Sequence, residues 1–155
     1  MRDEEGAEGR PQMSVGGAGR PGAVRISLSG PTRPFPDDAD DPMLDFVVRV
    51  RGEWVSVEVS VRTLYGDGLD GFLAELAEGF RGWDGSRTWR SLERHLTLSA
   101  THGAGGYVRL TWGLHGGPAS DDGWRFEATT VHAAGEDMRQ LAAEVRAFLR
   151  GGGRT

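Results

Sequence analysis

Apolar and polar residues alternate along six stretches of the chain, and this period of two predicts six β-strands. The six stretches are residues 24–29, 44–50, 55–61, 96–100, 108–114 and 124–130. Two of the gaps between them are short and contain glycine, namely residues 51–53 and 102–106. Gaps of this kind are typical of hairpin turns, so we expect the second and third strands, and the fourth and fifth, to form β-hairpins.

Two other stretches, residues 69–80 and 135–150, repeat their apolar residues at spacings of three and four. This period predicts one amphipathic helix in each stretch. Acidic residues stand near the start of both stretches, and arginines stand near the end of the second, before a triple glycine. Both features match the helix dipole and the usual way in which helices end.

These elements predict an α+β fold in which about six mostly antiparallel strands form one sheet and both helices pack on one face of it. Aligning Gly66 with Gly135 brings the apolar positions of the strand and helix around each glycine into register. A duplicated unit of three strands and one helix would explain the match. An unrelated strand followed by an amphipathic helix would align as well, so both interpretations stay open.

A length of 155 residues predicts one domain with a core large enough to fold without disulfides. Residues 1–22 are rich in glycine, charge and proline and show no apolar period, so we expect a disordered N-terminal tail. The single domain then covers residues 23–150, followed by a flexible tail at residues 151–155. The chain contains no cysteine, which excludes disulfides and thiolate metal sites.

The net charge is -5, and all 18 basic residues are arginine. After residue 42 the acidic and basic residues nearly balance, which argues against the basic stripe of a nucleic-acid-binding protein. No apolar run is long enough to span a membrane, and the first residues do not resemble a signal peptide. We therefore expect a cytoplasmic protein that binds neither nucleic acid nor membrane.

Residues 83–100 differ from an ordinary connection because they carry two tryptophans and three arginines. Four of them form a candidate interaction patch: Trp83, Arg87, Trp89 and Glu93. Tryptophan and arginine are enriched at the energetic centres of protein interfaces. The same side chains would also pin a helix to a strand, because each indole buries a large apolar area and an arginine can stack on it. The sequence leaves a binding patch and a structural pin as alternatives.

The segment from Trp83 to Glu93 reads W-D-G-x-R-x-W-x-S-L-E, and alternating leucines follow it. In this it resembles an uncharacterised actinobacterial domain-of-unknown-function family, over roughly residues 44–149. The chain departs from the family pattern at Tyr107, where members are expected to carry histidine. The resemblance implies no established activity, and its similarity to bacterial immunity proteins is one of pattern.

No catalytic motif is present in the sequence. His95, His102, His115 and His132 lack the spacing of a helical zinc site, and Ser91 lacks the glycine context of a nucleophile elbow. The glycine-rich segment at residues 103–106 lacks the residues of a phosphate-binding loop. We therefore expect no catalytic residues, no cofactor and no metal.

Two functional hypotheses follow. The first is a non-catalytic protein-interaction module, with an immunity or antitoxin role as its narrower form. The alternative is a small-ligand-binding or hydrolytic domain with a pocket between sheet and helices, lined by Trp112, Trp124 and Phe126. Dimerisation through an edge strand is compatible with either hypothesis.

Overall fold

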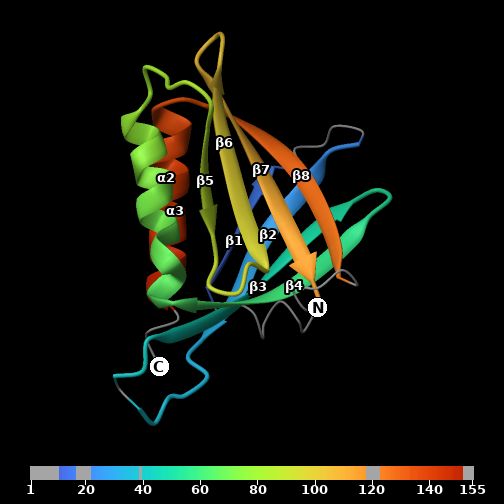
Figure 1. The fold of residues 1–155 in the computed structure, drawn as a ribbon, viewed down its shortest axis with the longest axis vertical. Coiled ribbons are helices and arrows are strands. Elements are labelled where there is room, and N and C mark those ends of the chain that lie inside the picture. The colour runs from blue at the N-terminus through green and yellow to red at the C-terminus, as the bar shows by residue number, and fades with distance from the viewer. Residues whose placement is uncertain (1–10, 17–21, 39, 118–122, 152–155) are drawn as a thin grey trace.

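The protein combines two antiparallel sheets with a pair of helices (Figure 1). A computed structural model describes residues 11–16, 22–38, 40–117 and 123–151. The first half contains β1 (Gln12–Gly16), β2 (Val24–Thr32), β3 (Met43–Gly52), β4 (Ser56–Leu64), the short turn η1 (Tyr65–Gly68) and α2 (Leu69–Glu78). The second half contains β5 (Ser86–Arg90), β6 (Leu96–Gly103), β7 (Tyr107–Gly116), β8 (Trp124–Ala133) and α3 (Glu136–Gly151).

Each sheet is an antiparallel meander in which every strand pairs with its neighbour in sequence, in the order β1-β2-β3-β4 and β5-β6-β7-β8. The α+β class, both helices and the two hairpins β3–β4 and β6–β7 are as predicted. The prediction of one six-stranded sheet is wrong. The described chain forms two sheets of four strands, so each half follows the order ββββα where three strands were expected.

The two strands missed by the sequence analysis both have weak apolar patterns. β1 lies inside the predicted disordered tail, and only Met13 and Val15 alternate with polar residues there. Val15 is nevertheless buried opposite Ile26 of β2, so the tail prediction is wrong for this segment. The rest of the predicted tails, residues 1–10, 17–21 and 152–155, lies outside the described residues. β5 lies in the tryptophan-rich connection, and only Trp89 of its five residues is partly buried.

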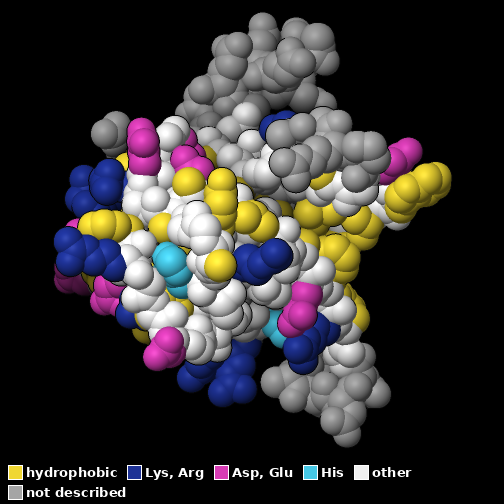
Figure 2. Space-filling model, turned by 90° about the horizontal axis from the view of Figure 1, so that it is seen from above, with side chains coloured by type: hydrophobic (Ala, Val, Ile, Leu, Met, Phe, Trp, Pro, Cys, Tyr) yellow, Lys and Arg dark blue, Asp and Glu magenta, His cyan; other side chains and the backbone are white. Residues whose placement is uncertain are grey.

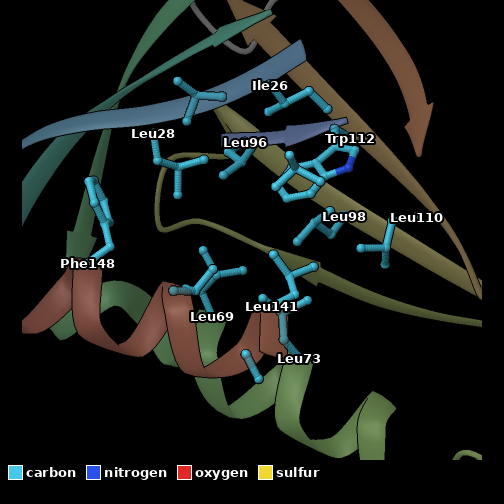
Figure 3. Close-up of a cluster of buried hydrophobic side chains, with 14 of the residues drawn as sticks. Ile26, Leu28, Leu69, Leu73, Leu96, Leu98, Leu110, Trp112, Leu141 and Phe148 are labelled. Atoms are coloured by element: carbon cyan, nitrogen blue, oxygen red, sulfur yellow. The ribbon is translucent and has the colours of Figure 1, made fainter. Parts of the chain in front are cut away.

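The core lies between the two sheets and the helix pair. Figure 3 shows leucines of α2 and α3 pointing toward apolar side chains of both sheets. The labelled residues are Leu69, Leu73, Leu141 and Phe148 from the helices, and Ile26, Leu28, Leu96, Leu98, Leu110 and Trp112 from the strands. The helices therefore close the space between two sheets, where packing on one face of a single sheet was predicted. No described helix combines the length and hydropathy that a membrane crossing requires.

The turn η1 between β4 and α2 is left-handed. Its four residues, Tyr65, Gly66, Asp67 and Gly68, have φ angles of 54°, 84°, 51° and 75°. Glycine adopts this region freely, whereas other residues lose about 1–2 kcal/mol there. The buried side chain of Thr63 supports the turn, because its Oγ1 accepts a hydrogen bond from the Gly66 amide (2.8 Å) and donates one to the Leu44 carbonyl (2.7 Å).

A left-handed glycine precedes each helix and touches the end of the other helix. Gly66 has a φ of 84°, and a Cβ placed on it would lie 2.8 Å from Cδ1 of Leu149 at the end of α3. Gly135 has a φ of 85°, and a Cβ placed on it would lie 3.5 Å from Cβ of Phe80, just after α2. The same separation of 69 positions relates Gly66 to Gly135 and Phe80 to Leu149. The two helices are thus packed antiparallel through equivalent contacts.

Alanine substitution should distinguish the two glycines. Gly66→Ala should lower the free energy of unfolding by about 2–4 kcal/mol, because it adds a steric overlap with Leu149 to the backbone strain. Gly135→Ala should cost only the strain, about 1–2 kcal/mol, because 3.5 Å is an ordinary contact. Urea unfolding of both variants measures the difference. If both variants lose the same free energy of unfolding, the contact with Leu149 does not exclude a side chain at position 66.

Candidate functional site

The tryptophan-rich connection is held to the left-handed turn through Asp67. Trp89 of β5 donates a hydrogen bond from Nε1 to the Asp67 carbonyl (2.8 Å). The amide of Leu92, just after β5, donates to Oδ2 of the same residue (2.7 Å). Oδ1 of Asp67 also accepts a bond from the Leu64 amide (3.1 Å). The strain at Asp67 is therefore offset by three hydrogen bonds, two of which join the first sheet's turn to the second sheet.

Ser91 serves the same connection. It is 1% exposed, and its Oγ accepts a hydrogen bond from the Leu96 amide (3.2 Å), while its own amide donates to the Leu96 carbonyl (2.9 Å). These bonds close the loop between β5 and β6. Glu93 of the same loop lies on the surface, with Oε1 3.8 Å from Nδ1 of His95. The W-x-S-L-E motif thus builds the β5–β6 loop and ties it to η1.

Trp83 and Arg87 form a stack at the other end of β5. The guanidinium carbon of Arg87 lies 4.5 Å from the ring centroid of Trp83. Trp83 is half-buried against the core, and its Nε1 donates to the Ala100 carbonyl (3.3 Å). His102 meets the same indole edge-on, with ring centroids 5.4 Å apart. Arg87 remains exposed and lies over Gly79, at the C-terminal end of α2, where a positive charge is favoured.

A second stack lies next to the first. The guanidinium carbon of Arg81 is 5.5 Å from the ring centroid of Phe80, whose side chain is 48% exposed. Nε2 of His102 lies 3.1 Å from the carbonyl of Phe80, which connects the two stacks. We call this group the aromatic–arginine cluster: Phe80, Arg81, Trp83, Arg87 and His102. Figure 2 views the molecule from this end, and arginine and apolar side chains lie side by side over the helix ends.

The structure brings together only half of the predicted patch. Trp83 and Arg87 are in contact, whereas Trp89 and Glu93 lie at the opposite end of β5, against Asp67 and His95. The sequence analysis missed Phe80, Arg81 and His102. Phe80 fitted the apolar stripe of the first helix, but the helix ends at Glu78 and the ring turns outward.

Neither arginine of the cluster has a carboxylate partner within the described part of the chain. Arginines elsewhere do. Arg62 donates from Nε and Nη2 to both oxygens of Asp45 (3.0 and 2.9 Å), and this hydrogen bonding raises the pKa of Arg62. The cluster therefore presents two exposed guanidinium groups that are fixed by aromatic rings and are not neutralised by those residues.

The four histidines do not meet. His95, just before β6, is a neighbour of His115 on β7, whose amide donates to the His95 carbonyl (3.0 Å). His102 belongs to the cluster, and His132 lies on β8 beside Thr130. Across residues 11–16, 22–38, 40–117 and 123–151, no three histidine, aspartate or glutamate side chains are arranged to hold a metal ion.

The residues expected to line a ligand pocket also lie apart. Trp112 is fully buried in the core, where its Nε1 donates to Oγ1 of Thr130 (2.9 Å). Trp124 is 45% exposed, and its ring lies directly over Gly116. Phe126 lines a groove along β8 that neither tryptophan reaches.

We expect His132 to contribute to the pH dependence of the protein's stability. Burial lowers the pKa of its imidazole below the ordinary value of 6.5, and the charge of Asp137 opposes this shift without cancelling it. As the pH is lowered through 6.5, the ring takes up a proton more readily in the unfolded chain than in the folded one, so the contribution of His132 lowers the free energy of unfolding. Well above pH 6.5 the ring is neutral in both states and contributes no slope.

His132→Gln should make this decline shallower, because the amide can accept the Thr130 hydroxyl and does not titrate. Urea unfolding between about pH 7.5 and 5.5 measures the slope. Burial also lowers the pKa of His115, so the double variant with His115→Gln should be shallower still. A single variant with the slope of the wild type would contradict the assignment to His132.

Comparison with known proteins identifies one matching family. No curated protein and no solved structure matches the chain. A family model described as a family of unknown function, DUF6228, matches residues 19–152. This match includes the motif at Trp83 to Glu93, all the strands after β1 and both helices. The chain therefore belongs to the family of unknown function DUF6228.

Proposed function

We propose that the protein is a non-catalytic binding module that recognises a protein partner through the aromatic–arginine cluster. The observation that carries this proposal is the pair of exposed stacks, Arg81 on Phe80 and Arg87 on Trp83, without a carboxylate neighbour in the described residues. Arginine and tryptophan dominate the energetic centres of protein interfaces.

The stacks define the chemistry of the partner. An arginine that lies on a ring keeps its planar edge free, and this edge donates two parallel hydrogen bonds to a carboxylate. Because the ring already restricts the guanidinium, less conformational entropy is lost when a partner binds. The cluster is therefore suited to an acidic protein surface, with aspartate or glutamate side chains above Arg81 and Arg87.

The cluster is held to the second sheet and to the core by hydrogen bonds and packing. Trp83 is bonded to the Ala100 carbonyl of β6, and His102 lies within hydrogen-bond distance of the carbonyl of Phe80. Trp83 also contacts the core. This packing supports the interpretation of Trp83 as a structural pin, and the exposed Arg87 on its ring supports the proposed binding role.

A non-catalytic role fits the use of the side chains that catalysis would need. The hydroxyl of Ser91 is buried and bonded to the Leu96 amide. His132 is bonded to Thr130, and His102 is bonded to the backbone. The narrower form of the proposal is an immunity or antitoxin role, in which the cluster covers an acidic region of a toxin, and it rests on similarity of pattern.

The double substitution Arg81→Gln/Arg87→Gln tests the proposal. It removes both charges while Trp83 and Phe80 keep their packing, so the midpoint of thermal unfolding should change by no more than about 2 °C. Proteins captured from a native lysate by the wild type and the variant are compared by mass spectrometry, and the affinity of a captured partner is measured by calorimetry. Loss of two charge-assisted contacts should weaken binding about 100-fold.

Arg51→Gln is the matched control, because Arg51 is exposed at the far end of β3 and the substitution removes the same charge. It should bind the partner as the wild type does. Trp83→Ala is unsuitable as the primary variant, because loss of its packing would lower stability as well as binding. A stable double variant that retains every partner of the wild type would refute the proposal.

A further inference from the structure

An open pocket lies at the opposite end of the helix pair, between the start of α2 and the end of α3. Its volume is about 470 Å³, within the range of pockets that hold small ligands. Leu44 and Leu149 form a buried apolar floor, and Met43 continues it. Tyr65 of the left-handed turn and Arg150 of α3 are exposed at its edge.

The pocket has a positive balance in a protein whose net charge is -5. Three arginines and two aspartates line it: Arg33, Arg146, Arg150, Asp41 and Asp70. Most of these charges are engaged. Arg146 donates from Nε to Oδ2 of Asp70 (3.2 Å), and Oδ1 of Asp41 accepts the Met43 amide (2.9 Å). Arg150 has no ion-pair partner among the described residues, so its guanidinium is available to an anion.

Tyr65 provides a second, independent observation. Its φ of 54° is a conformation that costs a tyrosine about 1–2 kcal/mol. Asp67 in the same turn recovers a similar cost through three hydrogen bonds, whereas Tyr65 makes one through its amide, to the Pro42 carbonyl (2.8 Å), and its side chain gains little from packing because the residue is 73% exposed. Glycine or asparagine would fit this backbone with less strain. An exposed aromatic ring at a strained position beside a pocket therefore points to contact with a ligand.

We propose that this pocket binds a small organic carboxylate, whose apolar body lies against Met43, Leu149 and the ring of Tyr65 and whose carboxylate pairs with Arg150. A floor of aliphatic side chains favours the apolar body. The guanidinium favours a carboxylate, because the two groups form parallel charge-assisted hydrogen bonds. The site lies a helix length away from the aromatic–arginine cluster, so the two proposals succeed or fail independently.

Benzoate and benzamide separate the two contributions, because they share a ring and differ in charge. Titration of the ¹⁵N-labelled protein, followed by amide chemical shifts, should show saturable binding of benzoate with shifts at residues 65–70 and 146–150. Benzamide should bind at least about ten-fold more weakly, because it lacks the charge that pairs with Arg150. Equal binding of the two compounds, or benzoate shifts confined to other parts of the molecule, would overturn the proposal.

Two variants test the residues. Arg150→Gln should lower benzoate affinity about ten-fold, whereas Arg109→Gln, which removes an exposed charge on β7, should leave it unchanged. Tyr65→Asn should lower the affinity several-fold and raise the stability of the free protein, because asparagine tolerates the left-handed region. Unchanged benzoate affinity in either pocket variant would contradict the assigned contacts. The Arg81→Gln/Arg87→Gln variant should bind benzoate as the wild type does.

Discussion

The fold depends on the left-handed turn Tyr65–Gly68, where the first half of the chain ends its sheet and begins its helix. An extended chain leaving β4 would continue beside the first sheet. Four consecutive residues with positive φ redirect it, so that α2 runs beside the sheets, next to α3, and turns its buried face to the core. Asp67 then binds the loop after β5, which fixes the position of the second sheet against the first. One strained turn thus sets both the helix direction and the junction of the sheets.

The two halves of the molecule repeat this arrangement with one important difference. Each half is a four-stranded meander followed by a helix, and each helix follows a left-handed glycine that contacts the end of the other helix. In the second half Gly135 makes the turn without left-handed neighbours among the described residues. The extra strain at Tyr65 and Asp67 therefore belongs to the first half alone. The order of four strands, glycine and helix that both halves share accounts for the antiparallel packing of the helices. The left-handed Tyr65 and Asp67 account for the hydrogen bonds and the exposed ring that are found only at the start of α2.

The sequence predicts the elements of this fold better than their assembly. Six strands and both helices follow from apolar periodicity, because their inward faces are formed by aliphatic or aromatic side chains. The strand β5 escapes prediction since only Trp89 of its five residues is partly buried, and Arg87 is exposed and stacks on Trp83. Apolar periodicity also does not predict that the strands divide into two sheets. The turn at Tyr65–Gly68 sets this division, and apolar periodicity carries no information on a left-handed turn.

The candidate site was also predicted only where it depends on residues that are close in sequence. Proximity along the chain correctly pairs Trp83 with Arg87, because both lie at the start of β5. It fails for Trp89, whose indole bonds to a carbonyl 22 residues earlier, and this contact exists only after the left-handed turn has formed. It also fails for Phe80, because the apolar stripe of α2 continues past the residue at which the helix ends. Residues whose role depends on the junction between sheets cannot be assigned from local pattern.

The relation between the two halves also connects the two proposed surfaces. The 69 positions that separate Phe80 from Leu149 separate Arg81 from Arg150 as well, so each helix is followed or ended by an apolar residue and an arginine. After α2 the apolar residue is exposed and Arg81 lies on its ring. At the end of α3 the leucine is buried, and Arg150 borders a pocket whose other edge is Tyr65. Equivalent positions therefore place an exposed guanidinium at each end of the helix pair, and the neighbouring side chain decides whether it lies on an exposed ring or beside a cavity. An exposed arginine stacked on an aromatic ring suits a protein partner, and a cavity suits a small anion.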